Sequence, residues 1–232
     1  MLIDELKNIA RNNGIVGAGG AGFPAYAKMT EKADTVILNC VECEPLLKLH
    51  RQLLATHTEE IIQMLDEVRE SFGAKEAVIG IKSEYVTTIK AIEEVIGDFP
   101  NVRICALKAA YPMGDEVVLI YEATGRVIKP GGLPIDENVV VYNVETMYNL
   151  YRAVHLNIPV TNKLVSIVGE IDHPLTVRVP LGTTVKEAIS LAGKITVEDP
   201  AYVMGGPMMG RLGTENTVIT KTTNAIIILP KD

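Results

Sequence analysis

The stretch GIVGAGGAGFPAYAKM, from Gly14 to Met29, decides how the first half of the chain is interpreted. Its core, Gly17 to Gly22, fits the pattern G-x-G-x-x-G of a dinucleotide-binding turn. That turn follows a strand, whereas residues 2–12 here place apolar side chains on one helical face. The stretch therefore predicts a glycine-rich loop after a helix. Backbone amides of such a loop could bind an anion at close range, or a flat ring could lie on the loop. The alternative is a flexible turn that binds nothing.

The rest of the first half predicts a parallel sheet with helical crossovers, because apolar runs of strand length alternate with helical periodicity. The predicted strands are 34–39, 77–81, 102–106 and 138–142, and the predicted helices are 46–72, 85–96, 115–124 and 144–155. This order is typical of an α/β, Rossmann-like domain.

A linker at 155–163 separates this pattern from shorter elements that predict a small α+β domain. Strands are expected at 164–170, 175–180, 217–221 and 225–229, with a helix at 184–192 and a glycine turn in GGPMMG. We therefore expect two domains, residues 1–160 and 161–232. The chain stops directly after a strand, so we expect it to be a piece of a longer protein.

Composition restricts the class of protein. The 232 residues carry a net charge of -7, with no Trp and three Phe, which argues against nucleic acid as the main partner. Neither a signal peptide nor an apolar run of the ~18–20 residues that span a membrane is present, and the three cysteines suit a reducing compartment. A cytoplasmic location is expected, including a peripheral position on a membrane or an enzyme complex.

Polar residues follow the first predicted strand in NCVECEP, Asn39 to Pro45. Ligands of open α/β sheets bind beyond such strand ends, so this segment suits contacts to a heterocycle or to ribose hydroxyls. A solvated acidic loop is the alternative. Cys40 and Cys43 form a C-x-x-C pair, a redox dithiol or half of a zinc site, but no second pair completes a metal site.

Two later segments add candidates: MGDE, Met113 to Glu116, and YNVET, Tyr142 to Thr146. Acidic residues at a helix start suit the helix dipole, and Asn143 is expected to cap a helix or to contact a ligand. The four histidines have no Ser or Asp partner at a recognisable spacing, so they are interpreted as structural or surface residues: His50, His57, His155 and His173.

Taken in order, GAGGAGFP with Lys28, NCVECEP, YPMGDEVVLIYEATGR, PGGLP and YNVETMYNL resemble the RnfC-type and PduS-type electron-transfer flavoproteins. These are related to the flavin-carrying NADH-dehydrogenase subunit of complex I. The segment VSIVGEIDHPLTVRVPLGTTVKEAI with GGPMMG resembles the SLBB domain, a β-grasp domain of the same proteins. The resemblance covers nearly the whole chain and implies a Rossmann-like FMN domain followed by an SLBB domain.

The resemblance also implies the site residues. FMN would contact Gly17, Gly19, Gly20, Gly22, Lys28, Asn39, Glu42, Asn143 and Thr146. NADH would lie near Phe23, Glu44 and Glu116. Flavin N5 accepts the hydride, so no side-chain acid or base is strictly required, and no metal is expected in this region.

The implied function is an NADH-dependent FMN oxidoreductase module that passes electrons to an iron–sulfur protein within a larger complex. The final acceptor would be a corrinoid or a proline-reductase system, and 4Fe-4S clusters are expected only in a missing carboxyl-terminal region. The alternative is a docking module without flavin, whose β-grasp domain binds a partner or a corrinoid. Sparse aromatic residues favour this alternative, whereas the intact glycine loop favours the oxidoreductase.

Overall fold

The structure, a computed structural model, describes residues 1–231 and divides into two compact units. The first unit contains residues 1–17, 23–43 and 50–159. The second contains residues from 160 onward together with two short segments, 18–22 and 44–49. The tip of the glycine loop and the end of the NCVECEP segment therefore group with the second unit, which the sequence did not indicate.

A four-stranded parallel sheet forms the centre of the first unit, in the order β3-β2-β1-β4. Its strands are β1 (Thr35–Cys40), β2 (Glu76–Lys82), β3 (Val102–Leu107) and β4 (Val139–Asn143). All four predicted strands are confirmed to within a few residues. The inner strand β1 is apolar almost throughout because both faces of the sheet are covered by helices, which is why its sequence does not alternate.

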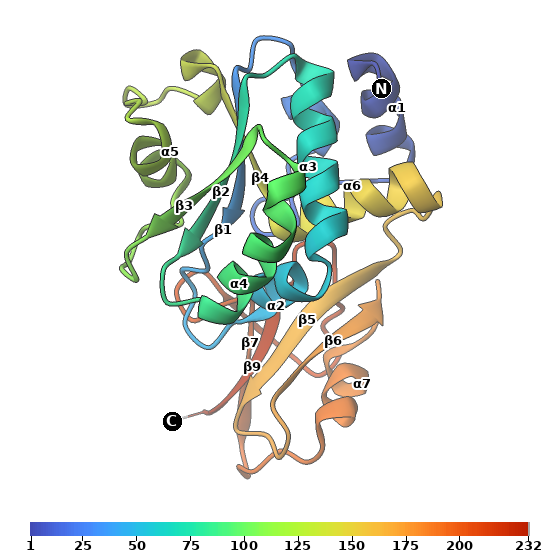
Figure 1. Cartoon of the computed structure of the whole chain (residues 1–232). Coiled ribbons are helices and arrows are strands. Elements are labelled where there is room, and N and C mark those ends of the chain that lie inside the picture. Colours follow the sequence, from blue (N-terminus) through green and yellow to red (C-terminus); the bar gives the residue numbers. More distant parts are fainter. Residues whose placement is uncertain (232) are drawn as a thin grey trace. The chain divides into compact units, whose positions relative to one another are not determined.

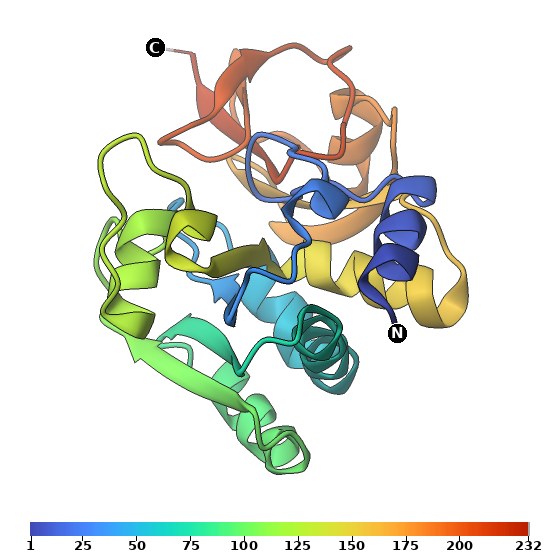
Figure 2. The same cartoon turned by 90° about the horizontal axis from the view of Figure 1, so that it is seen from above.

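Helices pack on both faces of this sheet (Figures 1 and 2). On one face, α5 (Glu116–Thr124) packs Leu119 and Ile120 against Ile37 and Val141. Side chains of a strand alternate between faces, so Leu38 points to the other side, where α3 and α6 contact β1. The remaining helices of this unit are α1 (Ile3–Asn12), α2 (Leu49–Thr56), α3 (Thr58–Phe72), α4 (Val86–Val95) and α6 (Val144–Leu156).

The predicted helix 46–72 is wrong as a single helix, because the chain breaks it at His57. His57 has φ -130° and ψ 43°, and the hydroxyl of Thr58 donates to the carbonyl of Leu54 at 2.7 Å. Residues 46–48 precede α2, and Leu46 adopts a positive φ of 69°. Leu47 is buried among apolar side chains of the second unit. It therefore belongs to that hydrophobic core and not to the apolar face of a helix.

The second unit contains a five-stranded mixed sheet in the order β6-β5-β9-β7-β8. Its strands are β5 (Asn162–Gly169), β6 (Leu175–Pro180), β7 (Pro200–Met204), β8 (Arg211–Gly213) and β9 (Ala225–Pro230). The strands β5 and β9 are parallel, and the other neighbours are antiparallel. Helix α7 (Val185–Ile189) packs on one face, and the segment 44–49 packs Leu47 and Leu49 on the other.

The predicted strand 217–221 is wrong, and β7 and β8 were not predicted. Val218 forms only an isolated bridge with Thr184. Threonine hydroxyls accept hydrogen bonds from nearby backbone N–H groups in this segment: Thr217 from Thr214 at 2.8 Å, and Thr223 from Thr220 at 3.1 Å. Such local bonds replace a strand ladder, although threonine favours strands elsewhere.

Candidate functional site

Two predicted site residues lie next to each other at the carboxyl ends of β1 and β4. Asn39 and Asn143 are paired in register on these neighbouring parallel strands. Lys28, from the short helix at Ala25–Lys28, reaches the same edge, where its Nζ lies 3.3 Å from the carbonyl oxygen of Val141. The sheet therefore gathers an ammonium group and two amides at the strand ends, where ligands of open α/β sheets bind.

The glycine loop begins after α1, as the sequence predicted, and its base is closed by a backbone hydrogen bond. The N–H of Gly17 donates to the carbonyl of Phe23 at 2.8 Å. Within the loop, Gly22 has a positive φ of 74°, and a Cβ there would stand 3.1 Å from a methyl group of Thr222. Gly20 is exposed, has no such backbone constraint, and a Cβ added to it would meet no atom within 4 Å. The fold itself thus requires glycine at position 22 but not at position 20.

Lys28 and Glu116 form an ion pair that joins the segment after the glycine loop to α5. Lys28 Nζ lies 3.2 Å from Glu116 Oε1, and both side chains are partly exposed. Asp115, the residue before α5, accepts hydrogen bonds from the N–H groups of Val117 and Val118 and so caps the helix. Asp115 therefore binds the free N–H groups at the start of the helix, and Glu116 is the acidic group that faces Lys28.

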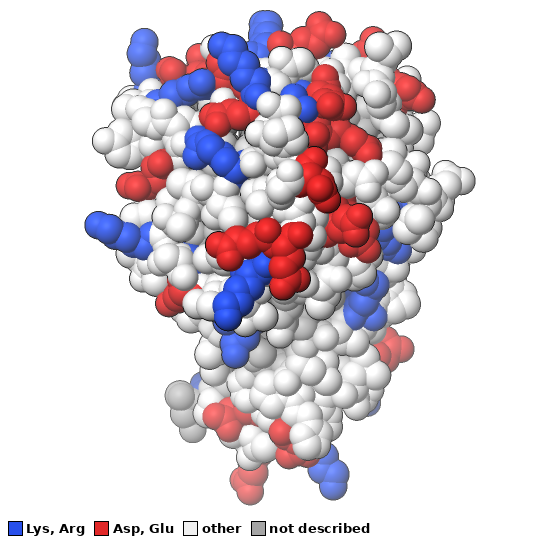
Figure 3. Space-filling view, in the orientation of Figure 1, with Lys and Arg blue, Asp and Glu red and all other residues white. Residues whose placement is uncertain are grey.

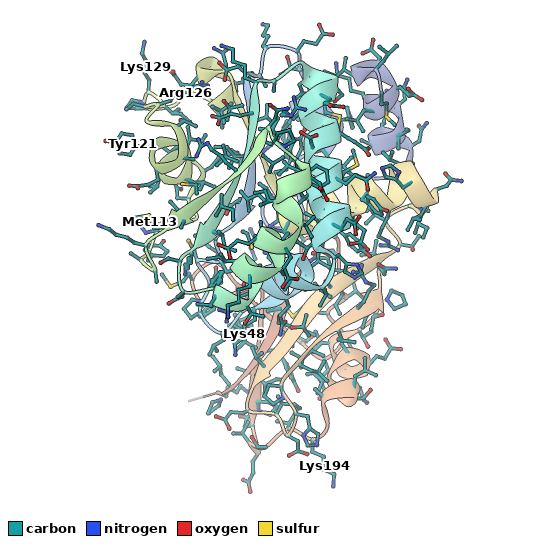
Figure 4. The ribbon with its side chains drawn as sticks, in the orientation of Figure 1. Lys48, Met113, Tyr121, Arg126, Lys129 and Lys194 are labelled. Atoms are coloured by element: carbon teal, nitrogen blue, oxygen red, sulfur yellow. The ribbon has the colours of Figure 1, made fainter. Side chains whose placement is uncertain are left out.

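The peptide of Gly114 is held from both sides by the NCVECEP segment. Asn39 Nδ2 donates to the carbonyl of Gly114 at 3.0 Å, while the N–H of Gly114 donates to Cys43 Sγ at 3.1 Å. Asn39 Oδ1 in turn accepts from the N–H of Val41 at 3.0 Å. This clamp fixes the loop before α5, and with it Glu116, to the end of β1. Figure 4 shows the neighbouring Met113 toward the carboxyl ends of the strands, whereas Arg126 and Lys129 lie toward the opposite end of the sheet.

Glu42 and His50 are buried beside each other next to Asn143. Glu42 Oε1 accepts the backbone N–H of His50 at 3.2 Å and lies 3.9 Å from His50 Nδ1. The other carboxyl oxygen, Oε2, is buried without a hydrogen-bond partner in the described part of the chain. Burial raises the pKa of Glu42, which outweighs the opposing effect of the His50 N–H and of the charge on Arg51.

Asn143 and Thr146 organise the start of α6. Asn143 Oδ1 accepts the N–H of Glu145 at 2.9 Å, which confirms the predicted cap, and its Nδ2 lies 3.3 Å from His50 Nδ1. Thr146 is buried, and its hydroxyl donates to the carbonyl of Val16 at 3.3 Å. Thr146 therefore connects α6 to the residues that lead into the glycine loop.

Glu44 has a different environment, within the second unit. Its two carboxylate oxygens accept the N–H groups of Met208 and Met209 at 2.8 and 2.9 Å. A Cβ on Gly206 would stand 1.9 Å from Glu44 Cδ, so the turn approaches the carboxylate as closely as glycine allows. Phe23, the other residue predicted on the NADH side apart from Glu116, is half-exposed at 52%.

Sequence reasoning missed four contributors to this arrangement. His50 was interpreted as structural or surface, yet it lies against Glu42 and Asn143. The roles of Gly114 and Cys43 in the clamp, and of the turn 206–210 in holding Glu44, had no periodic or spacing signal. Cys40 is fully buried, which raises the pKa of its thiol well above the usual range, and the three cysteines are free thiols.

The described residues contain no group of three or more His, Cys, Asp or Glu side chains arranged to hold a metal ion. Among residues 1–231, no helix is both long enough and apolar enough to cross a bilayer. On the face shown in Figure 3, acidic and basic side chains are interspersed.

Comparison with known sequences matches two families in order along the chain. The model of the Nuo51 FMN-binding domain matches residues 10–152, and that of the SLBB domain matches residues 164–212. Cobalamin reductase PduS of Citrobacter freundii is 40% identical over 227 residues, which are 97% of this chain and 50% of that protein. The Na(+)-translocating ferredoxin:NAD(+) oxidoreductase complex of Acetobacterium woodii has a subunit that is 32% identical over 235 residues, covering 99% of this chain and 53% of the relative.

Among solved structures, a chain of an NAD+-reducing NiFe hydrogenase in the H2-reduced state superposes with a TM-score of 0.77 at 20% identity. The match covers 98% of this chain and 47% of the hydrogenase chain, and it supports the fold alone. This chain spans about half the length of the curated relatives it matches.

Proposed function

This chain belongs to the family of Nuo51 FMN-binding domains, followed by an SLBB domain, and on that premise we propose that it is the flavin-binding module of an electron-transfer oxidoreductase. The proposed module takes a hydride from NADH onto FMN and passes electrons to an iron–sulfur partner. The observation that carries the proposal is the gathering of Lys28, Asn143 and the Glu42–His50 pair at the ends of β1 and β4. We also propose the domain division at residues 160 and 161.

The residues present fit FMN on two structural grounds. Gly20 is not required by the fold, and a flat ring that approaches the loop closely would account for a glycine there. Glu42 Oε2 is a buried polar atom without a partner in the described chain, as expected where a ligand supplies the missing contact. We propose that FMN lies over Gly17, Gly19, Gly20 and Gly22, with Lys28 toward its phosphate and Glu42, Asn39, Asn143 and Thr146 around the remainder.

When bound, the flavin accepts a hydride and releases electrons singly, so the protein contributes binding and electrostatics. Lys28 supplies a positive charge, which Glu116 neutralises in the absence of a ligand. A phosphate would compete with Glu116 for Lys28, since both are anions that pair with an ammonium group. Asn39 positions the Gly114 loop with the hydrogen bonds it already makes and retains one amide hydrogen for a ligand.

On the NADH side we propose Phe23, Glu44 and Glu116. Phe23 offers an exposed ring for stacking, and Glu116 is released when Lys28 turns to a phosphate. Glu44 is held by two backbone N–H groups, and its oxygens keep further lone pairs with which they could accept ribose hydroxyls.

The proposed partners are the other subunits of an electron-transfer complex, including an iron–sulfur protein. The relatives' names point to cobalamin or ferredoxin as the eventual acceptor, and a proline-reductase system is a further proposed acceptor. We place 4Fe-4S clusters outside residues 1–232 and the protein in the cytoplasm.

A second candidate function, a docking module without flavin, is favoured by one observation. Met208, Met209 and Leu212 on the second unit are 53%, 83% and 80% exposed, more than apolar side chains usually are. Flavin binding separates the two candidates. Titration of the purified chain with FMN, followed by quenching of flavin fluorescence, should give saturable one-to-one binding. An unquenched flavin that is lost completely on desalting would favour the docking module.

A further inference from the structure

The Glu42–His50–Asn143 cluster contains a buried acid with one satisfied and one unsatisfied oxygen. The Glu42 side chain is 5% exposed and that of His50 is 8% exposed. Oε1 accepts the N–H of His50, whereas Oε2 has no partner in the described chain. A charged carboxylate with an orphaned buried oxygen is costly, whereas a protonated carboxyl group would present a donor there.

Asn143 bears on the charge of the His50 ring. Its Oδ1 is occupied by the helix N–H of Glu145, which directs Nδ2 toward the imidazole of His50. An amide nitrogen only donates hydrogen bonds, so it requires a ring nitrogen that carries no hydrogen. Asn143 therefore favours neutral His50, so the imidazole gives Glu42 no positive charge that would stabilise the carboxylate.

The groups that face Glu42 come from four elements, and their charges do not reverse this conclusion. They are Cys40 of β1, His50 and Arg51 of α2, Lys82 at the end of β2, and Tyr85 before α4. The Arg51 guanidinium carbon lies 4.4 Å from the Tyr85 ring centroid, in a stacking contact. Arg51 and Lys82 favour the carboxylate, but burial has the larger effect and raises the pKa of Glu42.

We propose that Glu42 is an uncharged acid that carries its hydrogen on Oε2 and donates it in a hydrogen bond to an acceptor atom of the bound ring. The inference rests on the proposed flavin site and specifies its chemistry: the ligand class is a heteroaromatic ring with an acceptor nitrogen or oxygen. His50 is a positioning residue that orients the acid through its backbone N–H, which donates to Oε1. Because a neutral donor favours negative charge on the ring, Glu42 also favours the more electron-rich state of the ligand.

Three variants separate a neutral donor from a charged acceptor. Glu42→Gln keeps an acceptor for the His50 N–H and a donor at the Oε2 position, but it cannot ionise. Glu42→Ala removes both functions. His50→Gln removes the imidazole and leaves Glu42, so it assigns any pH dependence to one of the two residues.

Riboflavin is the probe, because the phosphate of FMN itself titrates near pH 6 and would obscure the result. Affinity is measured by fluorescence quenching from about pH 5 to about pH 9, a range that brackets a raised carboxyl pKa. Wild-type affinity should fall by about tenfold per pH unit above the pKa of Glu42, since only the protonated acid donates. Glu42→Gln should bind with a flat pH profile, Glu42→Ala weakly throughout, and His50→Gln with the fall retained.

The protonation state is also tested without any ligand. An infrared difference spectrum of ligand-free wild type minus Glu42→Gln at neutral pH should show the carbonyl stretch of a protonated carboxyl group. A carboxylate band in its place, or a wild type that binds riboflavin equally at all pH values while Glu42→Gln binds much more weakly, would overturn the proposal. A carboxyl band without riboflavin or FMN binding would contradict the flavin site and leave the neutral acid in place, so the two failures are distinguishable.

Discussion

Replacing Gly114 with alanine should displace the loop that carries Glu116. A Cβ at this position would stand 2.2 Å from the carbonyl oxygen of Val41 and 2.8 Å from Cys43 Sγ. The first neighbour is backbone, so no side-chain rotation relieves the contact. The loop must move, and the two hydrogen bonds of the Gly114 peptide to Asn39 and Cys43 are lost.

The expected cost follows from these two effects. Forcing one extra carbon into a packed site costs about 1–3 kcal/mol, and two hydrogen bonds add about 1 kcal/mol each. Gly114→Ala should thus lower the free energy of unfolding of the first unit by about 3–5 kcal/mol. For a domain of this size, that corresponds to a melting temperature lower by about 6–20 °C.

The assay is urea unfolding followed by circular dichroism, with Gly97→Ala as the matched control. A Cβ on Gly97 would meet no atom within 4 Å, so this variant should unfold within about 1 kcal/mol of wild type. Equal stability of Gly114→Ala and Gly97→Ala would refute the clamp on the Gly114 peptide.

Three further outcomes are expected. Gly20→Ala should weaken FMN binding about tenfold or more while the melting temperature stays unchanged, since the added Cβ enters only the space assigned to the ring; unchanged affinity by fluorescence titration would remove Gly20 from the site. Gly206→Ala should expel the Glu44 carboxylate and increase amide exchange of residues 206–210 measured by mass spectrometry, whereas unchanged exchange would argue against the Glu44 contact. The pKa of Glu42 is raised in the folded state, so the folded protein binds this proton more tightly than the unfolded chain does. The free energy of unfolding of the wild type, relative to that of Glu42→Gln, should therefore decrease as the pH rises above about 4.5. The total decrease is about 1.4 kcal/mol for each unit by which the pKa is raised. Urea unfolding at several pH values checks this last outcome, and a difference that grows in the opposite direction would contradict the neutral acid.

The sequence predicted the first sheet well because its strands are short, apolar and separated by periodic helices. The cap at Asn143 was also predictable, since asparagine is one of the favoured residues directly before a helix. The second sheet was harder. Threonine hydroxyls form local bonds at 214–223, where strand propensity suggests a strand.

The candidate site was predictable in its location and less so in its contacts. The family resemblance grouped Lys28, Asn39 and Asn143 as residues of one site, and the structure brings them together at one edge of the sheet. Contacts between residues distant in sequence gave the rest: His50 meets Asn143 across 93 residues, and Glu44 meets Met208 across 164. A residue type at a fixed spacing carries no signal for such contacts.

The most direct test of the central claim is an anaerobic titration of the FMN-loaded chain with NADH, followed by visible absorbance. The account predicts that the flavin band is bleached by about one equivalent of NADH, because the flavin accepts one hydride. A bound flavin that dithionite bleaches and NADH does not would contradict the proposed hydride transfer.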